Sequence, residues 1–412
     1  MRTLCLLLFA TSLVFADKPA KEAELKRTIA AGFVDLASWC QSKGLLAEGR
    51  PYVDEALSLD PESAKVKALK DKLAGDSTAT DAARKELEGK RAQYGKKLAQ
   101  LYRDLSKEKH PQKDDERFDG YLVRAFELDP KQIGPYLGQQ ANDAAQKREW
   151  ARAYRLLAGA ERSQPDAARA AKLREAELKC AEKQPIIRKA STHDMEYYLV
   201  LPKDWSPKRT WPVLVYVEGA GCNFRGAIDN YASQRGDDPY ILVTPQTFSS
   251  TNQLSKDKYT YKQELIDTWQ GGNRLGFDEE GLLAVLADLK RDFNAEERIF
   301  ISGFSGGGNL TWRMVFGHPE MLVAAAPACP NFANAGTVSE APERETLPVH
   351  VFQGEADEYL KTMLEAQWQG AKRLLDEHGY KSVERTLAPG VGHSAFVKEV
   401  LDFFRPHLAP KK

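Results

Sequence analysis

The pattern of apolar and polar positions divides the chain into two long regions with different periods. Between residues 17 and 185, Ala, Leu, Lys, Glu and Arg dominate and apolar positions recur with helical spacing, so we predict an all-helical region. Between residues 186 and 412, short β-branched and aromatic runs alternate with amphipathic helices. This alternation is typical of an α/β fold, in which helices cover both faces of a mostly parallel sheet.

Seven runs in the second region have the composition of strands. They lie at 197–201, 213–217, 240–244, 298–302, 323–326, 349–352 and 383–387. Between the third and fourth runs, apolar residues from Leu282 to Phe293 share one face of a predicted helix. We expect this helix to begin at Asp278-Glu279-Glu280, since acidic residues stabilise the positive end of the helix dipole.

Residues 1–16 have the features of a cleavable secretory signal. Arg2 precedes an apolar run over 4–14, and small residues end at Ala16. The run is shorter than the roughly 20 residues that a membrane span needs, and no later stretch is long and apolar enough. We therefore predict cleavage after Ala16, a secreted or periplasmic protein, and no membrane span.

A motif recurs in the helical region. The sequence ALSLDP at 56–61 returns as AFELDP at 125–130, and SQPD follows at 163–166. The period is 34 to 35 residues if one degenerate unit lies between the first two copies. Small residues let two helices approach closely, and the proline ends the second helix of each pair.

This period resembles the tetratricopeptide repeat. The matching residues are Phe33, Leu36, Gly44, Ala56 and Pro61 in the first unit, and Ala153, Leu157, Ala160 and Pro165 in the third. Residues 66–98 fit poorly, so a plain helical bundle or coiled-coil arm remains an alternative. The region has no titratable cluster suited to chemistry, and we expect it to contact a protein partner or the second half of the chain.

Charge does not identify a partner. Basic and acidic residues both number 59, so the formal net charge is zero and no attraction to nucleic acid is predicted. Residues 1–185 hold 34 basic and 29 acidic residues, against 25 and 30 in 186–412. Residues 1–185 therefore have a small positive net charge, and residues 186–412 a small negative one.

Candidate chemistry begins directly after the run at 298–302. There, Gly303-Phe304-Ser305-Gly306-Gly307 leads into a helical sequence, which is the G-x-S-x-G motif between a strand and a helix. Glycines flank the serine because a tight turn leaves no room for side chains. The helix that follows favours negative charge at its N-terminus. Ser305 is therefore the candidate nucleophile.

A serine nucleophile needs a base and an orienting acid, and two later runs supply candidates. The run at 349–352 continues into Gln353-Gly354-Glu355-Ala356-Asp357, and the run at 383–387 leads to Gly392-His393. Both side chains follow a strand's carboxyl end, where open α/β sheets place their sites. Glu355 and Glu358 are alternatives to Asp357. We expect the other histidines that we considered, including His110 and His318, to be structural or solvated.

The order Ser305, Asp357, His393 resembles that of the α/β-hydrolase superfamily, and particularly its secreted esterases related to polyhydroxybutyrate depolymerases and feruloyl esterases. The resemblance covers residues 190–408. It implies a serine hydrolase that cleaves a small-molecule or polymeric ester without a metal or organic cofactor. It also implies an oxyanion hole from the backbone N–H of Gly306 and of either Gly221 or Ala220.

The sequence departs from the family at Glu218, which replaces the usual histidine. A carboxylate beside a forming anion is unfavourable unless it is paired, and we take Arg225 as its possible partner. Cys222 and Cys329 flank the same edge of the sheet. Two strand spacings, about 10 Å, exceed the reach of a disulfide, so the two cysteines could form one only if their loops converge. Trp269, Phe304 and Phe332 either line a substrate pocket or pack loops.

Two other functions remain open. A serine peptidase is possible on the same fold, although that class usually adds an N-terminal β-propeller that the helical region does not supply. A catalytically silent hydrolase fold could instead bind partners through the helical repeats, but the complete Ser, Asp and His set argues against it.

Overall fold

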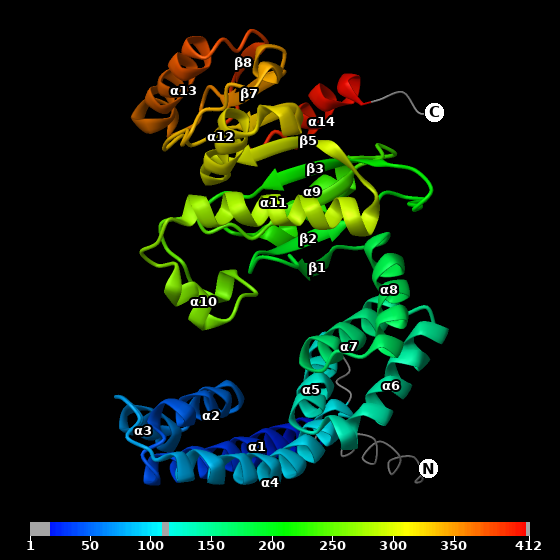
Figure 1. Ribbon diagram of the computed structural model, residues 1–412, viewed down its shortest axis with the longest axis vertical. Coiled ribbons are helices and arrows are strands. Elements are labelled where there is room, and N and C mark those ends of the chain that lie inside the picture. The colour runs from blue at the N-terminus through cyan, green and yellow to red at the C-terminus, as the bar shows by residue number, and fades with distance from the viewer. Residues whose placement is uncertain (1–16, 109–114, 409–412) are drawn as a thin grey trace, which may run out of the picture. The chain divides into compact units, whose positions relative to one another are not determined.

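The computed structural model describes residues 17–108 and 115–408 (Figure 1). The predicted signal at 1–16 and His110 lie outside these ranges. The chain divides into two compact units, one ending at Glu177 and the other beginning at Leu178. This boundary precedes the predicted one at 185/186 because the last turn of a helix belongs to the second unit: Ala181 O accepts a 2.8 Å hydrogen bond from Leu201 N.

The first unit is helical, as predicted. Its helices are α1 (Asp17–Ser42), α2 (Leu46–Leu59), α3 (Ala64–Lys72), α4 (Asp81–Ser106), α5 (Asp115–Leu128), α6 (Pro130–Gln146), α7 (Trp150–Ser163) and α8 (Ala167–Ala181), the last of which continues into the second unit. Helix α2 packs on α1, α5 on α4, and α7 on α6. The helix pairs are present, while their assignment to the tetratricopeptide family stays a prediction.

The recurring motif marks equivalent helix ends. Helices α2, α5 and α7 each stop at the motif, where the next backbone N–H bonds back to the carbonyl of Ala56, Ala125 or Ala160 at 2.9–3.1 Å. All three alanines are fully buried. A larger side chain at these positions would overpack the helix contact at a cost of about 1–3 kcal/mol. The repeat therefore has a packing cause.

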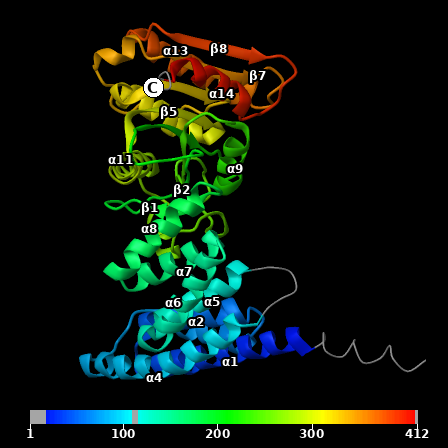
Figure 2. The ribbon, with the colours of Figure 1, turned by 90° about the vertical axis from the view of Figure 1, so that its right-hand side faces the viewer.

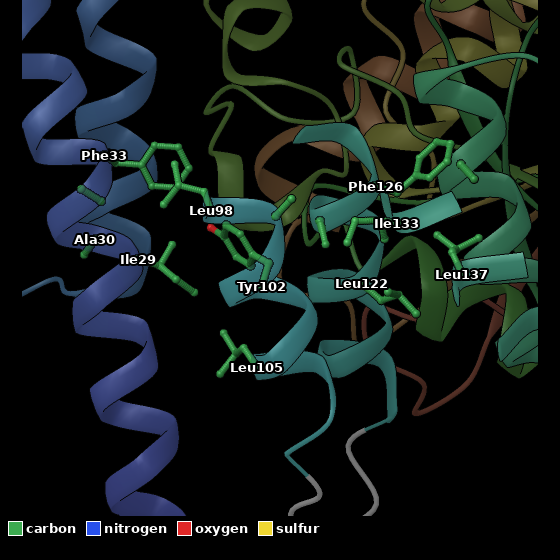
Figure 3. Packing of buried hydrophobic residues seen from close by; sticks show 14 of the residues in the cluster. Ile29, Ala30, Phe33, Leu98, Tyr102, Leu105, Leu122, Phe126, Ile133 and Leu137 are labelled. Atoms are coloured by element: carbon green, nitrogen blue, oxygen red, sulfur yellow. The ribbon is translucent and has the colours of Figure 1, made fainter. Parts of the chain in front are cut away.

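A continuous apolar core runs between these helices. Figure 3 shows Ile29 and Phe33 of α1 beside Leu98 and Tyr102 of α4, with Leu122 of α5 and Ile133 of α6 farther along the same cluster. Each of these side chains is 2% exposed or less. Their helical spacing in the sequence predicted this buried face.

The second unit contains an eight-stranded sheet. Its strands are β1 (Ile186–Lys189), β2 (Glu196–Val200), β3 (Trp211–Val217), β4 (Ile241–Pro245), β5 (Ala295–Phe304), β6 (Leu322–Ala328), β7 (Val349–Gly354) and β8 (Val383–Ala388). The order is β1-β2-β4-β3-β5-β6-β7-β8. Strands β3 to β8 pair in parallel, whereas β1 and β2 are antiparallel. The mostly parallel α/β sheet is confirmed.

Helices cover both faces of this sheet (Figure 2). The helices of this unit are α9 (Phe224–Gln234), α10 (Gln263–Thr268), α11 (Arg274–Phe293), α12 (Gly308–Gly317), α13 (Glu365–Glu377) and α14 (Val397–Phe404). Helices α11 and α12 pack together on one face, and α9 and α14 pack together on the other. Strand β3 is consequently buried along its whole length. Throughout 17–108 and 115–408, helices that combine the length and apolarity of a membrane span are absent.

Two details of the sequence prediction were wrong. Strand β1 was missed because its four residues have no alternation of their own, and it forms only by pairing with β2, Ile186 opposite Leu199. Helix α11 begins at Arg274 rather than Asp278, because Asn273 caps it by accepting from Gly276 N at 3.1 Å. Asp278 is instead fully buried and accepts the backbone N–H groups of Phe248 and Ser249 at 2.9 and 2.7 Å.

Candidate active site

Ser305 stands at the turn between β5 and α12. Its φ of +51° lies in the left-handed region that side chains other than glycine rarely adopt. Such backbone strain persists only where the surrounding structure enforces it. Here Ser305 O accepts the N–H of Asn331 at 2.8 Å, which ties the turn to the segment after β6.

Packing explains the two glycines that follow the serine. A Cβ on Gly306 would lie 2.0 Å from Ser250 O, and one on Gly307 would lie 2.2 Å from Val217 O. Both distances are far below a van der Waals contact, and both obstacles are backbone atoms that cannot rotate away. The turn can therefore approach its neighbours only with glycine at these positions.

Asp357 and His393 meet at the same edge of the sheet. His393 Nδ1 donates to Asp357 Oδ2 at 2.7 Å, and Asp357 Oδ1 accepts from Tyr359 N at 2.8 Å. The Asp357 side chain is fully buried, whereas that of His393 is 17% exposed. Burial alone would raise the pKa of Asp357, but the hydrogen bonds from His393 and the Tyr359 backbone lower it below its usual value. The acid is therefore held ionised against the imidazole.

Phe304, which precedes Ser305 in the chain, links the serine turn to His393. The Phe304 ring lies 4.7 Å from the His393 ring, centroid to centroid. Within the described part of the chain, Ser305 Oγ has no hydrogen-bond partner. Nucleophile–base hydrogen bonds are often long without substrate and shorten in the complex. Glu355 and Glu358, the alternative acids, are exposed and make no hydrogen bond to His393.

The predicted oxyanion loop borders the nucleophile. A Cβ on Gly219 would lie 3.2 Å from Ser305 Cβ, so the loop after β3 touches the turn after β5. Cys222 N donates to Gly219 O at 3.0 Å and closes this loop. Over 17–108 and 115–408, the N–H groups of Ala220 and Gly221 have no protein acceptor. Either could serve an anion, so the choice between them stays open.

Glu218 is not paired with Arg225, and that prediction was wrong. Arg225 Nε donates to Asp229 Oδ2 at 3.0 Å on the exposed side of α9, because the two lie one helical turn apart. Burial raises the pKa of Glu218 to about 7, against the opposing effect of hydrogen bonds from Tyr216 and the Gly219 backbone. The Glu218 carboxyl is therefore protonated more readily than an exposed glutamate.

All cysteines in the described ranges are buried free thiols: Cys40, Cys180, Cys222 and Cys329. Cys222 Sγ lies 3.4 Å from the Tyr259 hydroxyl, and Cys329 lies behind Asp357. The disulfide between Cys222 and Cys329 is not formed. Ligand atoms of Cys329, Asp357 and His393 lie within 4.8 Å of one another, but the carboxylate and imidazole already bind each other.

The aromatic residues near the site fall into two groups. Trp269 packs on Phe277, and Phe332 packs beside Trp312, so both belong to loop packing. Phe304 and Tyr359 contact the imidazole, with Tyr359 edge-on at 5.0 Å and 45% exposed. Sequence reasoning missed Tyr359, although its position two residues after Asp357 was an available signal.

Comparison with known proteins gives similarity in structure alone. No family model and no curated protein matches the sequence. A thermostable esterase is 22% identical over 54% of this chain and 62% of its own, with a TM-score of 0.39. A Bacillus cereus carboxylesterase is 18% identical over 53% and 97%, with a TM-score of 0.39. The poly(3-hydroxybutyrate) depolymerase of Bordetella parapertussis is 15% identical over 57% and 93%, with a TM-score of 0.42.

The chain spans less than two thirds of the thermostable esterase. Its own geometry is more informative than these likenesses. A mostly parallel sheet carries a strand–turn–helix serine at β5, and an acid and a histidine follow β7 and β8. The second unit therefore has the α/β-hydrolase fold.

Proposed function

We propose that this chain is a serine hydrolase that cleaves carboxylic esters through an acyl-enzyme on Ser305. The observation that carries the proposal is the buried Asp357, bonded at 2.7 Å to His393, whose ring contacts Phe304, the residue before the left-handed Ser305. A histidine so oriented has its other nitrogen available as a base.

In the proposed reaction, His393 Nε2 takes the Ser305 hydroxyl proton while Oγ attacks the ester carbonyl. The C–O bond to the leaving alcohol then breaks, and the alcohol takes the proton from His393. Water, activated by the same imidazole, attacks the acyl-enzyme and releases the acid. Asp357 stabilises the imidazolium that forms in both steps. These steps use only the chain's own residues and water.

The tetrahedral intermediate carries a negative oxygen that needs donors. Gly306 N–H would supply one and the loop at 219–221 the other. The protonated form of Glu218 supports this assignment, since a neutral carboxyl beside the loop does not repel the oxyanion. Removing one such donor typically costs about 10²- to 10³-fold in turnover.

A fluorophosphonate probe tests the nucleophile directly. The intact protein should be labelled at Ser305, and Ser305→Ala should abolish labelling. Labelling that persists in the variant would overturn the assignment. Complete absence of labelling in the wild type would instead favour a silent fold.

The substrate class is tested by a matched pair of ester and amide substrates. An ester panel from acetate to feruloyl and hydroxybutyrate oligomers should be hydrolysed, while peptide amides should not. Preference for the amide would favour a serine peptidase. Export through residues 1–16 and partner binding by the helical unit are further parts of the proposal, tested by fractionation and by affinity capture with the whole chain.

A further inference from the structure

A buried glutamine contacts the acid of the proposed triad. Gln353 is the last residue but one of β7 and is 2% exposed. Its Nε2 donates to Asp357 Oδ2 at 2.9 Å, the same oxygen that accepts His393 Nδ1 at 2.7 Å. The amide and the imidazole therefore converge on one carboxylate oxygen.

Asp357 depends on such protein donors because water does not reach it. Its side chain is fully buried, and the remaining oxygen accepts from Tyr359 N. The Cys329 thiol also hydrogen-bonds to the Asp357 carboxylate, and its Sγ lies 3.6 Å from Gln353 Nε2. Burial raises the pKa of the Cys329 thiol to about 11, so that side chain adds no charge. A buried carboxylate without enough donors would be strongly destabilised.

The position of Gln353 makes this contact part of the sheet. It pairs with Leu387 of β8 in the β7–β8 register, while Asp357 and His393 lie on the loops after those two strands. Ala356 N donates to Val391 O at 2.9 Å, which links the two loops. The amide is thus held by the strand, whereas the acid and base that it orients lie on loops.

We infer that Gln353 is a positioning residue that fixes the orientation of the Asp357 carboxylate toward His393. The inference rests on the proposed function. The simpler alternative is that Gln353 only fills space between the strand ends, and this alternative predicts a loss of stability without an effect on the imidazole.

Two variants of the full chain separate these alternatives. Gln353→Leu keeps the size and removes the donor, and it should lower kcat/KM about 10- to 100-fold, mainly through kcat. The low-field proton NMR signal of His393 Nδ1–H should also shift or disappear. Gln246→Leu is the control, since Gln246 is an equally buried glutamine at the end of β4 that bonds to Thr260. It should cost similar stability and keep kcat/KM within about twofold.

Gln353→Glu keeps the inference falsifiable if the leucine variant fails to fold. The protonated form of the new carboxyl can donate to Asp357, whereas its ionised form repels it. The ratio of variant to wild-type kcat/KM should therefore rise as pH falls. A flat ratio, or wild-type activity and NMR signal in Gln353→Leu, would overturn the inference. If Ser305→Ala remains active, the proposed function fails instead.

Discussion

Buried carboxylates have different hydrogen-bond donors in the two units. In the helical unit, Asp119 is buried on α5 and accepts from two guanidinium groups of α7, Arg152 at 2.9 Å and Arg155 at 2.7 Å. In the sheet unit, Asp357 accepts from an imidazole, an amide and a backbone N–H. The first arrangement joins helices, while the second sets a carboxylate with a lowered pKa against an imidazole. This contrast separates a carboxylate that stabilises structure from one suited to chemistry.

The largest expected effect comes from removing the nucleophile. Ser305→Ala should lower kcat on an activated short-chain ester by about 10⁴-fold or more. The folded state should be little affected, since Ser305 Oγ has no partner among the described residues. Ester assays and thermal melting on the same preparation check both. Turnover near that of the wild type would show that Ser305 is not the nucleophile, and the sheet unit would lose its proposed catalytic role.

The two acids can be exchanged for neutral side chains as a direct test. Asp357→Asn should lower kcat by about 10²- to 10⁴-fold because the amide cannot stabilise an imidazolium. Asp119→Ala should leave kcat unchanged but destabilise the fold by about 1–3 kcal/mol, because two half-buried guanidinium groups lose a buried partner that they share. Thus the free energy of unfolding, measured in urea, should fall more in Asp119→Ala, whereas kcat should fall more in Asp357→Asn. The same order of the two variants in both measurements would contradict the contrast between the units.

Asp278 gives the sheet unit a pH-dependent stability. Burial raises its pKa from 3.8 to about 7, so this group stabilises the fold fully below pH 3.8 and progressively less as pH rises to about 7. A pKa that is higher by one in the folded state than in the unfolded state changes the free energy of unfolding by about 1.4 kcal/mol. The isosteric Asp278→Asn should be less stable at low pH yet have a flatter profile of unfolding free energy between pH 4 and 7. An unchanged slope in urea titrations would show that Asp278 ionises normally.

The smallest expected effect concerns Glu218. As pH rises through about 7, its carboxyl ionises beside the proposed oxyanion loop and should oppose the negative intermediate. Glu218→Gln removes that charge, so the ratio of its kcat/KM to the wild-type value should rise about 3- to 10-fold between pH 6 and 8. Arg225→Gln is the control and should change nothing, since Arg225 pairs with Asp229. If this ratio of kcat/KM values does not depend on pH, the charge of Glu218 lies too far from the reacting atoms to affect them.

Local patterns in the sequence predicted much of this organisation. Each of the seven predicted strands is present. In β3, inside the sheet, every residue is buried, whereas β8, at the sheet's edge, has no buried residue. The motifs at 56–61 and 125–130 mark helix ends, since the small residue and the proline act within a single turn. Three features were missed or misplaced, namely β1, the start of α11 and the partner of Arg225, because the strand and helix patterns alone do not show which nearby group each will bind: β2, Asn273 or Asp229.

By itself, the sequence determined the two regions and the strand–turn–helix around Ser305, because these depend on residues close together in the chain. It also determined the chain order of the proposed nucleophile, acid and base, because each of them follows its own predicted strand. Only the tertiary structure decided that His393 contacts Asp357 rather than Glu355 or Glu358, that Gln353 shares the same carboxylate oxygen, and that Glu218 is half-buried beside Tyr216. Of these contacts, that of Asp357 with His393 joins two loops 36 residues apart, whereas the others are local in sequence but depend on the side chains that the folded sheet packs around them. Their burial sets the charge of each group, and burial arises only when the sheet has formed.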